Sequence, residues 1–121
     1  MEYGALMPLV FIFVGTLEII MGIPLLLEKI KPNTLYGFRT PKTRSSDEIW
    51  YKANKYFGRD FLIAGIIITI CSLFLLVCET GLSVIEISWI GILILTIPLV
   101  AIVARGLVYL KKVVNQISKR T

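Results

Sequence analysis

Two charged residues lie inside long apolar segments and are the first candidates for chemistry. Glu18 interrupts the apolar run at about 5–27, and Arg105 lies in the run at about 84–110. A charge inside a bilayer is costly unless it is paired, hydrated or neutralised, so such residues commonly mark functional sites. Each lies in the second half of its run, and we expect the two at similar depth. We expect Glu18 to pair with Arg105 or an arginine of the loop at 28–60; a ligand or proton site and a protonated carboxyl bonded to backbone are the alternatives.

The chain offers little for catalysis or metal binding. It contains no histidine, which removes the commonest general base and the commonest metal ligand. Cys71 and Cys78 would lie about 10 Å apart on one helix face, too far for a disulfide. We find no nucleophile–base pair, metal-ligand cluster or phosphate-binding loop. The sequence therefore predicts no enzyme, no catalytic residue, no metal and no cofactor.

Three apolar segments supply the framework that positions these residues. The 121 residues are 56% apolar and 17% charged, whereas soluble domains have about 45–50% and about 25%. Segments at about 5–27, 61–78 and 84–110 are near or above the ~20 residues that a helix needs to cross a membrane. The first segment lacks a basic start and a cleavage site, so we expect a permanent span. The fold class expected is an all-α integral membrane protein, one domain over 1–121.

Small residues in these segments predict how the helices pack. Gly15 and Gly22 lie on the same helix face as Glu18, and glycines there let another helix approach closely. The second segment offers a stripe of small or hydroxyl side chains for contact with the other two helices. Its members are Ala64, Gly65, Thr69 and Ser72.

The basic residues predict an orientation. Of thirteen Lys and Arg residues, eight lie between the first and second segments and five lie near or after the end of the third. The positive-inside rule then places the N-terminus outside, and the loop at 28–60 and the tail at 111–121 in the cytoplasm. Attraction to anionic membrane lipids accounts for the net charge of +5 without a nucleic-acid partner. We expect a multi-pass protein of the cytoplasmic cell membrane, and the sequence leaves a homo-oligomer open.

The loop at 28–60 carries the most varied side chains. Two prolines and a glycine within 31–43 disfavour helix and predict a turn-rich connector. Ser45 and Glu48 fit a capping box, so a helix is expected at about 46–58. Its apolar and aromatic residues share one face and its cations lie elsewhere, which is typical of an amphipathic helix in the membrane interface.

Two interpretations of this loop stay open. One is an anchor that orients the second span. The other is a pocket or docking surface on the cytoplasmic side, because lipid anchoring alone does not explain the asparagine at position 54 or the turn at 39–41. The candidate binding residues are Asn33, Tyr36, Gly37, Arg39, Thr40, Pro41, Trp50, Asn54 and Arg59.

The same loop resembles the signature of a known family. An apolar segment directly follows a pattern that is similar to that of the SdpI family: Pro32-Asn33…Tyr36-Gly37-Phe38-Arg39-Thr40-Pro41…Thr43…Ser46…Trp50…Ala53-Asn54…Gly58-Arg59. The resemblance covers the motif and the helix arrangement on both sides of it, and this chain is similar to the short, single-module members. It implies a bacterial membrane immunity protein that protects the cell from a membrane-active peptide toxin.

The resemblance also implies partners, namely a peptide toxin or a transcriptional repressor that such a protein sequesters at the membrane. Two further functions remain as alternatives. A small transporter or channel would need several copies, because three helices enclose little space. An accessory subunit of a membrane complex suits the apolar excess equally well.

Overall fold

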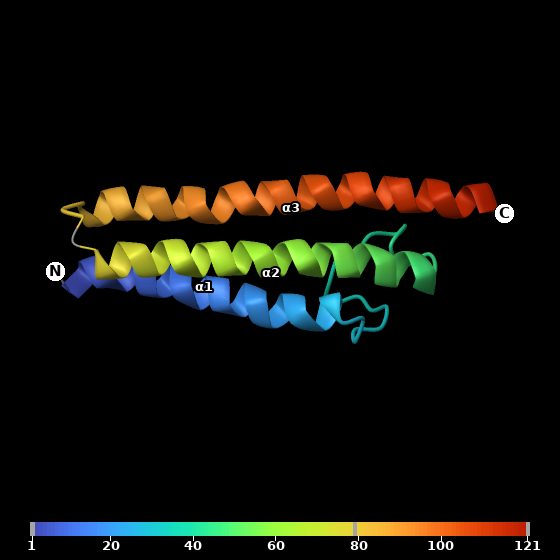
Figure 1. The fold of residues 1–121 in the computed structure, drawn as a ribbon, viewed down its shortest axis with the longest axis horizontal. Coiled ribbons are helices and arrows are strands. Elements are labelled where there is room, and N and C mark those ends of the chain that lie inside the picture. The colour runs from blue at the N-terminus through green and yellow to red at the C-terminus, as the bar shows by residue number, and fades with distance from the viewer. Residues whose placement is uncertain (1, 79, 121) are drawn as a thin grey trace.

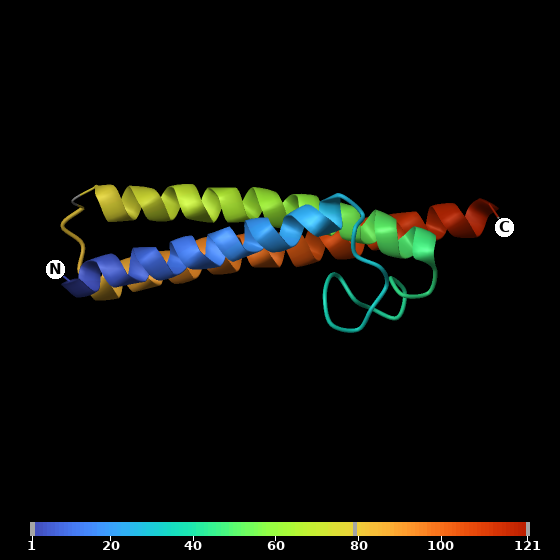
Figure 2. The same ribbon diagram turned by 90° about the horizontal axis from the view of Figure 1, so that it is seen from below.

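The computed structural model describes residues 2–78 and 80–120, which form three long α-helices and the loop between the first two. Helix α1 spans Glu2–Leu26, α2 spans Asp47–Val77 and α3 spans Val84–Arg120. The helices lie side by side, and α2 runs antiparallel to α1 and α3 (Figures 1 and 2). All three are long and apolar enough to cross a membrane. The predicted all-α class with three apolar helices is confirmed.

The helices are longer than a bilayer requires. Helices α2 and α3 have 31 and 37 residues, which correspond to about 46 and 55 Å, whereas the hydrocarbon core is about 30 Å thick. Both must extend beyond it, and their charged ends, 47–60 and 111–120, are the ends suited to do so. Figure 1 shows these ends together with the loop, while the N-terminus and the α2–α3 connection lie at the opposite end of the bundle.

The helix expected at about 46–58 is not a separate interfacial element. It forms the first turns of α2 and continues without a break into the apolar segment. Its apolar face does not lie open to the membrane interface, because Ile49 and Ala53 pack with Leu110 and Val113 of α3 in a small buried core. Periodicity reveals which face of a helix is apolar, but it does not reveal what covers that face.

The start of α2 and the end of α3 both differ from the sequence prediction. Ser46, not Ser45, caps α2, since its side chain accepts the backbone N–H of Ile49 at 3.2 Å. The expected tail at 111–121 is helical as far as Arg120. Arg120 donates to the Glu48 carboxylate, which ties the last turn of α3 to the first turn of α2.

Helices α1 and α2 approach each other through glycines. Gly15 and Gly22 of α1 face Gly65 and Gly58 of α2, and in each helix the two glycines are two turns apart. A Cβ atom on Gly65 would lie 2.6 Å from the backbone oxygen of Gly15, and one on Gly58 would lie 2.8 Å from that of Gly22. The close approach expected at Gly15 and Gly22 is therefore confirmed, and only hydrogen fits at the contact.

Helix α3 packs on this pair along its length. Near the end opposite the loop, the Phe11 ring of α1 lies against Gly91, where a Cβ atom would overlap the ring. Toward the loop, Gly106 faces the Phe38 ring. The Phe11–Gly91 contact fixes the depth of α3 relative to α1.

We predict that Gly65→Ala weakens the α1–α2 contact. The new methyl group would meet the Gly15 oxygen at 2.6 Å and the Ile19 nitrogen at 3.0 Å, and both are backbone atoms that move only if the helices separate. The expected loss is about 1–3 kcal/mol of unfolding free energy, as for other overpacked sites. Denaturant titration of the detergent-solubilised protein, followed by circular dichroism, measures it.

The matched control is Gly4→Ala, because nothing lies within 4 Å of the Cβ position at Gly4. That variant should keep its stability or gain up to about 1 kcal/mol from helix propensity. Equal stability of the two variants would contradict the close contact.

Candidate functional site

Asn54 fastens the loop to α2. Its side chain is 2% exposed. Oδ1 accepts the backbone N–H of Phe38 at 2.6 Å, and Nδ2 donates to the carbonyl oxygens of Phe38 at 3.3 Å and Trp50 at 3.0 Å. One buried amide thus satisfies both backbone groups of Phe38, as a neighbouring strand would.

Gly37 is required beside this asparagine. Its φ angle is 107°, and a Cβ atom there would lie 2.6 Å from Oδ1 of Asn54. Glycine adopts this left-handed conformation without a steric penalty and leaves room for the amide. Gly37 and Asn54 therefore position Phe38 together: the glycine leaves room for the amide, and the amide binds the backbone of Phe38.

Two aromatic side chains tie the loop to the helices by long-range hydrogen bonds. The indole Nε1 of Trp50 is buried and donates to the carbonyl oxygen of Ile30 at 2.8 Å. The hydroxyl of Tyr36 donates to the carbonyl oxygen of Met21 in α1, and partial burial raises the pKa of this hydroxyl. The loop is thus bound to α1 and to α2 at separate points.

Asn33 shapes the first turn of the loop. Its Oδ1 accepts the backbone N–H groups of Leu35 and Tyr36 at 2.8 and 2.7 Å, the pattern of an Asx turn. The Arg39 guanidinium donates to the carbonyl oxygen of Thr34 and closes the same turn from the other side.

The threonines shape the second turn. Thr43 is fully buried, and its Oγ1 accepts the Thr40 N–H at 2.7 Å and donates to the Thr40 carbonyl oxygen at 3.0 Å. Pro41 is exposed between them. These hydrogen bonds give most of the candidate binding residues a role inside the protein, and their role in binding a partner stays a prediction.

An ion cluster lies where the apolar part of α2 begins. Asp60 immediately precedes the charge-free segment at 61–78. Nε of Arg105 donates to one Asp60 oxygen at 2.6 Å, and a terminal nitrogen of Arg59 lies 3.3 Å from the other. The Asp60 side chain is 9% exposed and that of Arg105 is 53% exposed, so one largely buried carboxylate is shared by two arginines.

The expected pairing of Glu18 with Arg105 is therefore wrong. Arg105 lies fourteen residues beyond Gly91, whereas Glu18 lies only seven beyond Phe11, which packs against Gly91. The two side chains therefore differ in depth by about 10 Å. Among the described residues, the buried Oε2 of Glu18 has no hydrogen-bond partner.

The Tyr56 ring contacts both arginines of this cluster. Tyr56 and Tyr109 stack with ring centroids 4.1 Å apart and an angle of 5° between the rings. The guanidinium carbons of Arg59 and Arg105 lie 4.7 and 5.4 Å from the Tyr56 ring centroid. Both distances are within the range of cation–π attraction.

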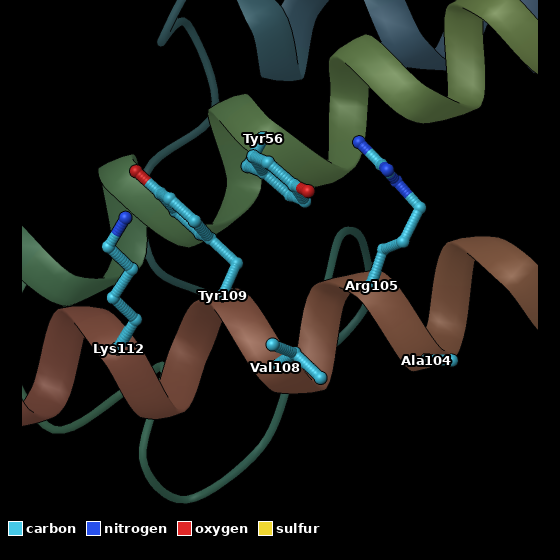
Figure 3. Close-up of a pocket in the computed structure, with 6 residues that line it drawn as sticks. All are labelled: Tyr56, Ala104, Arg105, Val108, Tyr109 and Lys112. Carbon is cyan, nitrogen blue, oxygen red and sulfur yellow. The ribbon is translucent and has the colours of Figure 1, made fainter.

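A groove of about 520 Å³ opens between α2 and α3 beside the stacked tyrosines (Figure 3). The side chains that line it are Tyr56, Ala104, Arg105, Val108, Tyr109 and Lys112. A smaller hollow of about 220 Å³ lies on the Leu26 side of the tyrosines, where Lys52, Lys55 and Arg59 line it. In the described chain, no cluster of three or more metal-ligating side chains is present.

Of the charged and aromatic residues that line this groove, the sequence predicts a role for Arg105 and not for Tyr56, Tyr109 or Lys112. It predicts a role for Arg59 in the neighbouring ion cluster, but not for Asp60. A signal was present, because positions 105, 109 and 112 share one face of a helix at spacings of four and three. The face of α2 that these three positions contact could not be predicted, because it depends on the depth of α3 relative to α2.

These features define a multi-pass membrane protein of three helices, in which α2 runs antiparallel to α1 and α3. The folded loop and the charged ends of α2 and α3 lie on one side of the bundle. A family model for the SdpI/YfhL protein family matches residues 29–109, and the chain belongs to this family. The match covers the loop from residue 29 onward, α2 and most of α3, so the resemblance seen in the signature is confirmed. No curated protein and no solved structure gives a significant match.

We predict that Asn54→Ala releases the loop. The N–H and C=O of Phe38 would lose the amide that satisfies them, at a cost of about 1–3 kcal/mol for a group left buried and unpaired. Limited trypsin digestion in detergent should then cut faster after Arg39 and Lys42, as measured by mass spectrometry of the fragments. The control is Asn115→Ala, the same change on the exposed face of α3. Unchanged cleavage in Asn54→Ala would show that the loop does not depend on this amide.

Proposed function

We propose that this chain is a membrane immunity protein that protects a bacterial cell from a membrane-active peptide toxin. The observation that carries the proposal is the family match over residues 29–109, which includes the loop signature and two of the three apolar helices. The exposed apolar side chains add support, because a toxin that inserts into the membrane could contact them directly. Among these exposed side chains are Phe13, Phe74 and Trp89, in the half of the bundle opposite the loop.

We further propose that the chain lies in the cytoplasmic membrane with its N-terminus outside and its loop and C-terminus in the cytoplasm. The position of the loop and the C-terminal end of α3 on one side of the bundle supports this orientation (Figure 1), because all thirteen basic residues lie in or near those segments. In that orientation the loop side is where a cytoplasmic repressor would be held, if the chain also signals.

Cysteine labelling tests the orientation. In a chain with Cys71→Ala and Cys78→Ala, Thr80→Cys should react with a membrane-impermeant maleimide in intact cells. Lys42→Cys should react only after the cells are permeabilised. Both positions are exposed on the protein surface, so a difference in labelling reports the membrane barrier. Reaction of Lys42→Cys from outside would reverse the orientation.

Expression in a toxin-sensitive host tests the immunity function. Cells that carry the protein should survive a membrane-permeabilising peptide toxin and keep their membrane potential, whereas cells with an empty vector should lose both. The Gly4→Ala variant should protect as well as the original chain, and Gly65→Ala should protect less because its helix packing is weakened.

Absence of protection by a chain that is correctly inserted in the membrane would argue against immunity. Ion flux through liposomes that contain the purified chain would then favour a transporter or channel. A stable protein partner that co-purifies with the chain would favour an accessory subunit.

A further inference from the structure

Two cations on one face of α3 flank the groove beside the stacked tyrosines. Arg105 and Lys112 are seven residues apart, about 10 Å along the helix, and Tyr109 lies between them. Figure 3 shows all three side chains projecting from α3 toward α2. Asp60 accepts from Nε of Arg105, which fixes the direction of that guanidinium. Lys112 forms no ion pair with any residue of 2–78 or 80–120.

The groove is positively charged and accessible. None of its lining residues is acidic, and the Asp60 carboxylate next to it is 9% exposed and paired with two arginines. The groove also lies at the level where α2 passes from charged to charge-free residues, at position 61. Tyrosine and basic side chains favour this level, where the phosphates of the lipid headgroups lie.

An apolar stripe leads from the groove along α3 into the membrane-spanning part. Ile97, Val100, Ala104 and Val108 follow one another at spacings of three and four and share one face of the helix. All four are exposed, and Val108 at the groove is 72% exposed. A cationic groove continuous with an exposed apolar stripe matches a molecule that has an anionic head and a hydrocarbon tail.

We propose that this groove binds the headgroup of one anionic glycerophospholipid. Its phosphodiester lies between Arg105 and Lys112. The glycerol backbone of the lipid lies against the tyrosine rings, and an acyl chain follows the apolar stripe from Val108 toward Ile97. The site stands apart from the proposed immunity function, and either can fail without the other.

Native mass spectrometry of the full chain in detergent tests the site. The probes are phosphatidylglycerol and phosphatidylcholine with identical acyl chains, and the measured quantity is the dissociation constant of the first bound lipid. Phosphatidylglycerol should bind more tightly than phosphatidylcholine. Lys112→Gln should weaken phosphatidylglycerol binding by about fivefold, the effect of one lysine near a lipid phosphate. It should weaken phosphatidylcholine binding less, because the choline cation of that lipid already offsets the charge of its phosphate.

Lys111→Gln is the matched control, because it removes the same charge from an exposed neighbour that does not line the groove. It should bind phosphatidylglycerol as the original chain does. An equal loss in Lys111→Gln and Lys112→Gln would mean diffuse attraction without a site. Equal affinity for the two lipids in the original chain would also overturn the proposal.

Competition with glycerol 3-phosphate separates a lipid site from a site for a soluble phosphate. This probe carries the phosphate without an acyl chain, so it should not displace phosphatidylglycerol at equal concentration. Displacement at equal concentration would show that the apolar stripe contributes nothing, and the assignment to a lipid would be wrong.

Discussion

The close approach of α1 and α2 at their glycines determines where the rest of the protein can go. Where Gly22 meets Gly58, the last turn of α1 lies directly against α2, and Leu25 fits beside both Gly58 and Gly37. Asn54 lies one helical turn before Gly58 on α2. The loop therefore starts close to the Asn54 amide, which then binds the backbone of Phe38. A larger residue at either glycine would move the start of the loop away from the group that fastens it.

The fastened loop in turn helps to place α3. Phe38, held by Asn54, lies against Phe57 of α2 with ring centroids 5.5 Å apart and faces Gly106 of α3. It also packs on the small core in which the extended ends of α2 and α3 meet. Outside the hydrocarbon, burial of apolar surface from water stabilises this core, whereas inside it the helices depend on close packing. The bundle thus combines two kinds of packing along its length.

Most residues of the signature at 32–59 stabilise the conformation of this loop. Asparagines, a left-handed glycine, threonines and two aromatic side chains each satisfy a backbone group or fill a turn. The same residues also suit a binding site, because polar and aromatic side chains in a loop serve both purposes. Five cations of α2 and α3 lie beside the stacked rings of Tyr56 and Tyr109, on both sides of the stack.

The sequence by itself determined the number of apolar helices, the glycine contact and the family, because these depend on local composition, spacing and residue type. It did not determine which charges meet. Glu18 and Arg105 looked equivalent in depth, but the contact of Phe11 with Gly91 sets α3 so that Arg105 reaches Asp60. It also could not show that the amphipathic turns after Ser46 lie against α3. Both outcomes depend on the relative positions of whole helices, which only the tertiary packing decides.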